Sequence, residues 1–328
     1  MSLATKYRPK TFEDMVGQDI AKRILIKEVE TNNIKHSYIF EGTTGAGKTT
    51  ASRILANVVN GVTIEFDVAS HNSVDDIKEL INSVRTKPIG YDKVVVILDE
   101  VHTIFGRKDS LAAQALLKIL EEPPKHLIFI MCTTEGDKII DTIRNRCECI
   151  PFTNVDIDSI VARLDFICKQ ETIQYDNIMA LTEIAKRADG SMRNAISILE
   201  QITSLGALTV ANVTNTISSK YDNMFKVMYA TFDKDITTII NVVDSVQDID
   251  KFVNSYFTFI LDICIYAKTN NIKLTKLPSV FTDNLSFSDS EKKILNTIMN
   301  DLLQLQYEGR NNPILKQLFI AVAMQEIK

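Results

Sequence analysis

A glycine-rich octapeptide, Gly42-Thr43-Thr44-Gly45-Ala46-Gly47-Lys48-Thr49, constrains the fold of this chain more than any other segment. It follows the strand-like Ile39-Phe40 and precedes the helix-like stretch Ser52–Leu55. Glycines at the first and sixth positions let the backbone turn sharply and direct N–H groups inward, where they can bind phosphate oxygens. The pattern therefore predicts a strand, a phosphate-binding loop and a helix in succession.

The last residues of this loop carry the expected chemistry. Lys48 is expected to bring positive charge to the β- and γ-phosphates of a nucleoside triphosphate, and Thr49 to ligate Mg²⁺ through its hydroxyl. The N-terminal end of the following helix also favours an anion. A chance glycine-rich turn is the alternative, which the strand and helix context disfavours. The candidate nucleotide-binding residues are Gly42, Thr43, Thr44, Gly45, Ala46, Gly47, Lys48, Thr49 and Thr50.

A second motif lies about fifty residues further on, where the apolar run Val94–Leu98 ends in two carboxylates. A buried parallel strand delivers its C-terminal residues to the edge of the sheet where ligands bind. We expect Asp99 to support Mg²⁺ and Glu100 to polarise the water that attacks the γ-phosphate. Acidic residues after a strand are more often a solvated loop, but the upstream phosphate loop reverses that preference.

The order of apolar and amphipathic stretches predicts an α/β fold. Apolar runs separated by helical patterns are typical of buried parallel strands, so residues 1–153 are expected to form a doubly wound α/β domain. After Pro151 the remaining pattern is helical. The expected strands are Ser37–Phe40, Thr63–Val68, Lys93–Leu98 and Leu127–Cys132, and the expected helices are Ser73–Arg85, Asp158–Gln170, Asn177–Arg187, Ser191–Ser204 and several after Asp222.

Composition limits the classes of protein that fit. A chain of 328 residues exceeds one compact core, so two or three domains are expected. No stretch approaches a membrane span and the first residues lack a secretory signal, so we expect a cytoplasmic protein. The five cysteines are expected to be free thiols. A net charge of −5 argues against a globally basic nucleic-acid binder but leaves room for a local basic surface.

Six motifs occur in one order along the chain and are together far more specific than the phosphate loop. With them, roughly residues 4 to 204 resemble the clamp-loader ATPases of the AAA+ class. The similarity is greatest to bacterial DNA polymerase III gamma/tau subunits and extends to replication factor C small subunits. The motifs are Tyr7-Arg8-Pro9, Val16-Gly17-Gln18, the phosphate loop, Asp99-Glu100-Val101-His102, Ala115-Leu116-Leu117-Lys118 and Leu120-Glu121-Glu122-Pro123-Pro124.

The resemblance implies roles that spacing alone does not assign. Thr134 matches the family's first sensor of the γ-phosphate, and Arg193 matches the second sensor, on a helical lid. Taken alone, Thr134 is an ordinary strand residue and Arg193 an ordinary solvated arginine. The adenine side of the pocket is implied to include Tyr7, Arg8, Val16 and Gly17, although an N-terminal arm packed on the domain explains the same residues.

Arg146 aligns with an arginine that, in the family, enters the nucleotide site of the neighbouring subunit. Its guanidinium suits a bidentate grip on phosphate oxygens, so Arg146 is expected to act in trans as an arginine finger. Asn145 replaces the family's serine, and Arg144 is a second candidate for the finger. The competing interpretation is a surface arginine paired with an acidic neighbour.

A finger in trans implies a ring oligomer, expected to be pentameric, with other clamp-loader subunits. The resemblance implies three domains: a P-loop AAA+ domain at 1–153, a helical lid at 154–218 and an all-α collar for oligomerisation at 219–328. It further implies ATP and Mg²⁺ as ligands and a sliding clamp as partner. Primer-template DNA is expected to bind through its backbone, and the replicative polymerase to interact indirectly.

The chain departs from the family at two places. The bacterial subunit carries a four-cysteine zinc module near residue 60, whereas this chain has no cysteine before Cys132, so no zinc is expected. The segment Ile104–Ser110 is about four residues longer than usual and places Arg107 and Lys108 on a loop. These two residues, together with the Asn72/Ser73 start of the helix Ser73–Arg85, are candidate DNA contacts.

Other functional classes stay open because a phosphate loop serves many of them. A small-molecule kinase would need a second substrate pocket and would not need Arg146. A non-hydrolysing scaffold subunit of the same ring conflicts with intact Lys48, Thr49, Asp99 and Glu100. The nearest alternative is another ring ATPase of DNA metabolism, such as a branch-migration helicase, an initiator or a helicase loader, which would be expected to carry an added DNA-binding domain.

Overall fold

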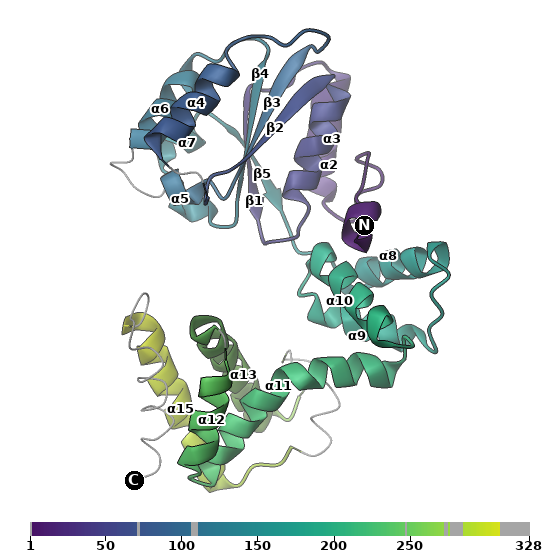
Figure 1. Cartoon of the computed structure of the whole chain (residues 1–328), viewed down its shortest axis with the longest axis vertical. Helices are drawn as coiled ribbons and strands as arrows, with labels where there is room; N and C mark the ends of the chain where they lie inside the picture. The colour runs from purple at the N-terminus through teal and green to yellow at the C-terminus, as the bar shows by residue number, and fades with distance from the viewer. Residues whose placement is uncertain are drawn as a thin grey trace. The chain divides into compact units, whose positions relative to one another are not determined.

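The computed structural model describes residues 2–70, 73–105, 111–246, 248–271, 275 and 285–308, without the side chains of 214–220 and 304–308. The chain divides into two compact units, residues 1–208 and residues 209–328. The first unit contains the β-sheet and the second is helical throughout its described part (Figure 1).

A parallel five-stranded sheet lies at the centre of the first unit, between two layers of helices (Figure 1). The strand order is β2-β3-β4-β1-β5, and every pair is parallel. Side chains alternate along β3, so that Val94 and Val96 face one helical layer while Val95 and Ile97 face the other. Burial on both faces explains the continuous apolar runs of the sequence. The strands are β1 (Ser37–Gly42), β2 (Gly61–Asp67), β3 (Lys93–Asp99), β4 (Leu127–Thr133) and β5 (Glu148–Phe152).

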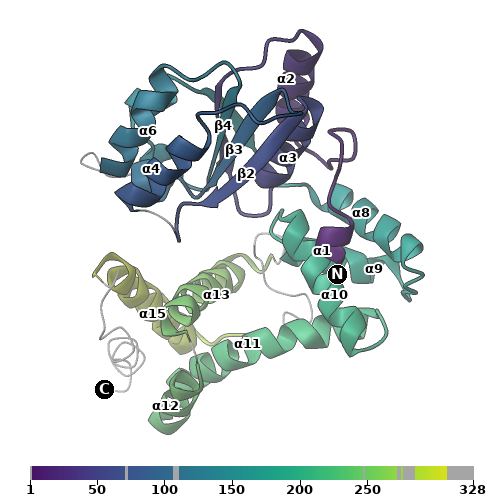
Figure 2. The same ribbon diagram turned by 45° about the horizontal axis from the view of Figure 1, so that its top comes forward.

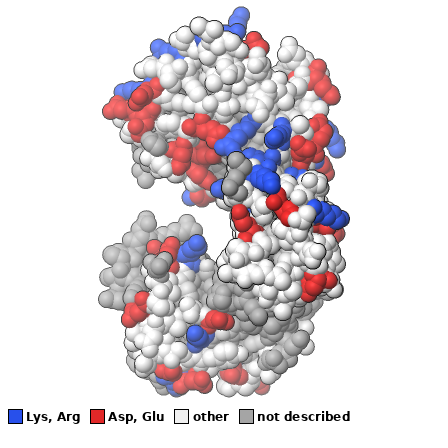
Figure 3. Space-filling view, turned by 45° about the vertical axis from the view of Figure 1, so that its right-hand side comes forward, with Lys and Arg blue, Asp and Glu red and all other residues white. Residues whose placement is uncertain are grey.

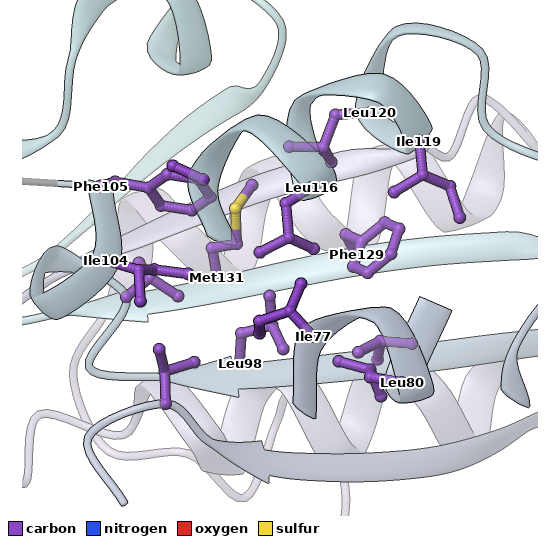
Figure 4. Close-up of a cluster of buried hydrophobic side chains, with 14 of the residues drawn as sticks. Ile77, Leu80, Leu98, Ile104, Phe105, Leu116, Ile119, Leu120, Phe129 and Met131 are labelled. Atoms are coloured by element: carbon purple, nitrogen blue, oxygen red, sulfur yellow. The ribbon is translucent and has the colours of Figure 1, made fainter. Parts of the chain in front are cut away.

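Each face of the sheet has its own apolar core. Figure 4 shows one of them, where Phe129 and Met131 of the sheet lie among aliphatic side chains from the covering helices, such as Leu116. Residues on the opposite face, such as Tyr38 and Phe40, belong to the second core. One core is covered by α4 (Val74–Ser83), α5 (His102–Phe105), α6 (Leu111–Glu121) and α7 (Asp141–Arg144), and the other by α2 (Asp19–Glu30) and α3 (Lys48–Val58).

The α/β fold expected from the sequence is confirmed, with one strand that was not expected. The edge strand β5 contains Pro151 and alternates buried with exposed residues only at its end. Proline has no backbone N–H to donate to a neighbouring strand, so in a sequence it usually indicates the end of a strand. An edge strand tolerates it, because one side of the strand needs no partner. Here Pro151 lies opposite Glu41 of β1.

Three helices follow β5 and form a small bundle at the end of the first unit (Figure 2). Each begins at a side-chain cap: Asp156, Asn177 and Ser191 accept hydrogen bonds from backbone N–H groups of the first turns. The short N-terminal helix α1 (Leu3–Lys6) contacts the last of them. The three are α8 (Ile157–Gln170), α9 (Ile178–Arg187) and α10 (Met192–Leu205).

The second unit has a core rich in aromatic and aliphatic side chains, including Tyr256, Phe259 and Ile263. Its first helix, α11, runs without interruption across the expected boundary between residues 218 and 219. The two compact units instead separate at residue 208, and the three-domain division stays a prediction. The described helices are α11 (Val210–Phe232), α12 (Ile236–Ser245), α13 (Ile249–Thr269) and α15 (Asp289–Glu308). None of the helices in the described ranges combines the length and hydropathy that crossing a bilayer requires.

Candidate nucleotide site

The glycine-rich segment forms a loop between β1 and α3. Lys48, the first residue of α3, folds back over the loop, and its Nζ donates to the carbonyl oxygens of Gly42 at 2.7 Å and Thr43 at 3.0 Å. The side chain is buried, and burial lowers the pKa of Lys48. A buried ammonium whose partners are neutral carbonyl oxygens is well placed to gain from an anion bound in the loop.

Two glycines of the loop are required by close approach of the chain. A Cβ built at Gly42 would lie 2.0 Å from the carbonyl oxygen of Phe152, on the edge strand β5. At Gly45, where φ is +80°, a Cβ would lie 2.0 Å from Ser191 Oγ and 3.4 Å from Arg193 Cβ. The start of α10 therefore lies directly on the loop. The sequence separates Arg193 from the loop by almost 150 residues, and the fold brings the two together.

An oxygen pair lies beside the loop where a divalent cation is expected. Thr49 Oγ1 lies 3.2 Å and 3.3 Å from the two carboxylate oxygens of Asp99. Burial raises the pKa of Asp99, and hydrogen bonds from Cys132 and Thr49 act in the opposite direction. Mg²⁺ usually binds one or two carboxylate or hydroxyl oxygens together with substrate phosphates, so this pair fits it. Within the described ranges, no group of three or more His, Cys, Asp and Glu side chains could hold a metal by itself.

Glu100 follows Asp99 in a strained backbone conformation. Its φ is +54°, in the left-handed region that non-glycine residues rarely adopt. Its side chain accepts a hydrogen bond from Thr134 Oγ1 at 3.1 Å. Strand β3 thus presents Glu100, and the end of β4 presents Thr134, at the same edge of the sheet. The hydroxyl that resembles the first sensor is in direct contact with the carboxylate expected to orient water.

A cavity of about 490 Å³ lies beside the loop, Asp99 and Glu100, within the usual volume of small-molecule sites, whereas Gly42, Thr43 and Thr134 do not line it. Its lining includes Asp99, Glu100 and Arg193, while Arg146 does not contribute to it. Gly17 is likewise not in the lining and lies against Val155. The expected residues that line the cavity are Tyr7, Arg8, Val16, Thr44, Gly45, Ala46, Gly47, Lys48, Thr49, Thr50, Asp99, Glu100 and Arg193.

Several further lining residues, among them Met15, Arg163, Ile196 and Glu200, were not expected from the sequence. Ile196 has helical spacing typical of a core position, so its pattern carries no sign of a site. Arg163 donates from one guanidinium nitrogen to the carbonyl oxygen of Tyr7 at 2.9 Å. Arg163, Ile196 and Glu200 come from the lid helices α8 and α10, which are distant from the loop in sequence, so only the fold reveals them.

The N-terminal arm is attached to the lid helices. The Tyr7 hydroxyl donates to the carboxylate of Glu171, and the Tyr7 ring lies edge-on to Phe166. The backbone N–H of Leu3 donates to Glu200 at 3.2 Å. The Tyr7 side chain is therefore occupied by the lid, as in the interpretation of an arm packed on the domain, although Tyr7 also lines the cavity.

The two candidate finger arginines have different surroundings. Arg144 forms a fork with Glu41, with N–O distances of 2.9 Å and 3.3 Å, and also donates to Gly136 O at 2.8 Å. Arg146 is exposed and pairs with Glu121 at 2.8 Å. An exposed ion pair contributes about 0–1 kcal/mol, so Arg146 can leave Glu121 at little cost. Arg144 is committed to its own subunit and is a poor second candidate for the finger.

The candidate DNA contacts receive little support. Arg107 and Lys108 lie outside the described residues. At the start of α4, Ser73 and Asp76 form a reciprocal capping box that uses both backbone N–H groups. Asp75 and Asp76 also place negative charge in the first turn, which repels phosphate. These features disfavour phosphate at this helix start, and its role as a DNA contact stays a prediction. Figure 3 shows basic and acidic side chains interspersed on the visible face of the first unit, with one local gathering of Lys and Arg.

Two known protein families match consecutive parts of the first unit. Residues 61–156 match the family described as "DNA polymerase III, delta subunit". Residues 159–207 match "DNA polymerase III clamp loader subunit, ATPase lid domain". The second match covers helices α8 to α10, which include Arg193.

The chain is similar over most of its length to named bacterial proteins. It is 32% identical to DNA polymerase III subunit gamma of Buchnera aphidicola over 265 residues, which covers 73% of this chain and 70% of that protein. It is 31% identical to the gamma/tau subunit of Mycoplasma genitalium, with 82% and 50% covered, and 33% identical to the tau subunit of Bacillus subtilis, with 79% and 51% covered. The chain thus spans about half the length of the last two relatives.

Solved structures confirm the AAA+ fold. The Thermotoga maritima RuvB Holliday junction branch migration motor matches with a TM-score of 0.56 and 18% identity, over 68% of this chain and 78% of RuvB. At that identity the likeness shows the fold alone. The sequence relatives, the lid match and the arrangement of the loop, Asp99 and Glu100 are consistent with one another, and the chain belongs to the family of DNA polymerase III gamma and tau clamp-loader subunits.

Proposed function

We propose that this chain is an ATPase subunit of a sliding-clamp loader. ATP binding drives clamp opening and loading on primer-template DNA, and hydrolysis releases the clamp. The observation that carries this proposal is the convergence of Lys48, Glu100 and Arg193 on one cavity in a chain of this family.

Within the site, the backbone of the loop and the Lys48 ammonium bind the phosphates, while the hydroxyl of Thr49 and the carboxylate of Asp99 hold Mg²⁺. Mg²⁺ held there would supply positive charge that offsets the charge of the phosphates. Glu100 orients and polarises the attacking water. Thr134 and Arg193 contact the γ-phosphate from the sheet and from the lid. The adenine lies against Tyr7, Arg8, Val16 and Gly17, and no zinc is used.

The assembly is a ring, and Arg146 completes the site of the neighbouring subunit. The exposure of Arg146 and its weak pairing with Glu121 support this role. In this proposal, residues 1–153 form the ATPase domain, 154–218 the lid and 219–328 the collar. The ring is a pentamer with other clamp-loader subunits, and its further partners are the sliding clamp, primed DNA and, indirectly, the polymerase. The bacterial relatives make the cytoplasm the expected compartment. Arg107 and Lys108 remain candidate DNA contacts.

The test is ATP hydrolysis by the full chain assembled with its partner subunits, with and without clamp and primed DNA. We expect turnover to increase when both are present, and a fluorescent clamp to become resistant to dissociation from circular primed DNA. If the rate of ATP hydrolysis is unchanged by the clamp but increases with branched DNA, the alternative is favoured. That alternative is another ring ATPase of DNA metabolism, such as a branch-migration helicase or a helicase loader. The same ATPase activity without any oligomer would overturn the role of Arg146.

A further inference from the structure

A polar cluster extends from Glu100 towards the surface of the first unit, and the proposed function uses only part of it. Its remaining members are His102, at the start of α5, and Thr133 and Glu135, at the end of β4. All three residues follow Glu100 in the sequence, and none of them lines the cavity. We call His102 and Glu135 the relay pair.

The contacts of this cluster form a chain. His102 Nδ1 lies 3.3 Å from Glu100 Oε2, the same oxygen that accepts from Thr134, and 3.2 Å from Thr133 Oγ1. On the opposite side of the ring, Nε2 lies 3.1 Å from Glu135 Oε1. Both ring nitrogens therefore have oxygen partners, which fixes the ring plane. The His102 side chain is only 15% exposed, so packing restricts it further.

The backbone around Glu100 is held just as firmly. The carbonyl oxygen of Glu100 accepts from Thr103 N at 3.1 Å and from Thr103 Oγ1 at 2.9 Å. The next N–H, that of Val101, donates to Cys132 O at 3.2 Å. These bonds maintain the left-handed φ of Glu100. The remaining freedom of Glu100 is the rotation of its side chain, which the contacts with Thr134 and His102 limit.

We propose that His102, oriented by Glu135, is a positioning residue that aims the Glu100 carboxylate at the attacking water. The inference rests on the proposed ATP hydrolysis at this site. A carboxylate placed about 1 Å from its productive position can cost up to about 10²-fold in rate, so a fixed ring beside Glu100 has a large effect on turnover. Contacts with partly exposed side chains contribute little to folding, so the same ring has a small effect on stability.

Glu135 also has a partner that serves as a control. Lys138, three residues further on, forms an ion pair with the other carboxylate oxygen of Glu135 and is 52% exposed. Removing Lys138 leaves the contact between Glu135 and His102 in place. If the relay pair positions Glu100, the kcat of Lys138→Met should equal that of wild type, whereas the kcat of Glu135→Gln should be lower.

The test measures ATP affinity and turnover separately in the full chain assembled with its partner subunits. The variants are His102→Ala, Glu135→Gln, the double variant His102→Ala/Glu135→Gln and the control Lys138→Met. We expect kcat to fall about 10-fold or more in the first two, as for loss of a positioning contact, with the Kd for ATP unchanged. We expect the double variant to be no slower than His102→Ala, because without the ring the side chain at position 135 has nothing to orient.

Three results would overturn the proposal. These are an unchanged kcat in Glu135→Gln, an equal fall in Lys138→Met, or losses that multiply in the double variant. If His102→Ala does not fold, His102→Gln provides a further measurement, since its amide can still reach one neighbouring oxygen. We expect its kcat to lie between those of wild type and His102→Ala. A wild-type assembly that binds ATP but never hydrolyses it would refute the proposed function itself, and that outcome is visible before any variant is made.

Discussion

The phosphate loop and the segment that carries Arg146 differ in how completely their own chain satisfies them. Lys48 is 8% exposed and bonded within the loop, and Glu100 is held by Thr134 and by its strained backbone. Arg146 is exposed, with an acidic surface neighbour and a carbonyl oxygen of Thr142 as its partners. The phosphate loop is thus organised without a ligand, whereas the segment with Arg146 exposes a positively charged side chain to solvent.

This difference separates two kinds of functional residue. A preorganised group acts on a ligand that enters its own cavity, because its position is fixed in advance. A loosely paired cation on the surface is suited to a site that another molecule completes. Arg144, only two residues from Arg146 but bonded in a fork to Glu41, shows that proximity in sequence does not decide which kind a residue becomes.

The largest expected effect comes from Glu100→Gln, which keeps the shape of the preorganised region but removes its base. We expect ATP turnover to fall about 10³-fold, as for loss of a general base, while ATP affinity stays within about twofold because no phosphate contact is lost. Turnover of the assembled subunit and equilibrium binding of a fluorescent ATP analogue measure the two quantities. If the Kd for the ATP analogue rises by the same factor as turnover falls, Glu100 acts on nucleotide binding instead.

Arg146→Ala tests the exposed region. In an assembly with wild-type subunits, we expect turnover in the presence of clamp and primed DNA to fall about 10²-fold, as for loss of one group that stabilises transition-state charge. The isolated chain should bind ATP as before, since Arg146 does not line its cavity. Unaltered turnover in mixed assemblies would remove the distinction between the two regions.

Lys48→Met tests how much the buried ammonium contributes to binding. Loss of a charge-assisted bond to phosphate should weaken ATP binding about 30-fold, corresponding to about 2 kcal/mol. Burial lowers the pKa of Lys48, so the charged form is the costly one in the free protein, and an apolar side chain of similar length should not destabilise the fold. Calorimetric titration with ATP and urea denaturation without it separate these effects.

Arg144→Met gives the smallest expected effect and sharpens the contrast with Arg146. Because the fork to Glu41 is partly exposed, we expect the free energy of unfolding to fall by about 1 kcal/mol. Urea denaturation measures this change, and Arg146→Ala is its matched control, with an expected change close to zero. A large loss of turnover without loss of stability would make Arg144 the finger.

The sequence predicts the first unit well where patterns are local and strong. The glycine loop and the apolar run ending in Asp99 have fixed spacing, and the interior strands β1, β3 and β4 follow from apolar runs that burial on both faces explains. The sequence does not predict strand β5. Pro151 is tolerated there because β5 is at the edge of the sheet, and the edge position is a property of the whole sheet that the segment itself does not show. The start of α4 shows a similar limit, since the Asp76 carboxylate accepts from the Ser73 N–H and Ser73 Oγ accepts from the Asp76 N–H, so neither donor is left for a phosphate.

Residues of the site that depend on tertiary structure are not visible in the sequence. Arg163 and Glu200 line the cavity because the lid helices lie against the N-terminal arm, and no local pattern distinguishes them from solvated side chains. The roles of Tyr7, Thr134, Arg146 and Arg193 came from the resemblance. Spacing alone would leave them ordinary residues.

The junction between the sheet and the lid lies one hydrogen bond away from the phosphate loop. Thr43 Oγ1 donates to Asn154 Oδ1 at 2.5 Å, and a Cβ at Gly190 would lie 2.3 Å from Asn154 Cβ. Asn154, two residues past the end of β5, thus lies between the loop and the turn before α10. Any rotation of the three lid helices about this junction must either break the Thr43 bond or pull the loop along with it. A displacement of the lid helices is therefore mechanically coupled to the loop through the contacts of Asn154.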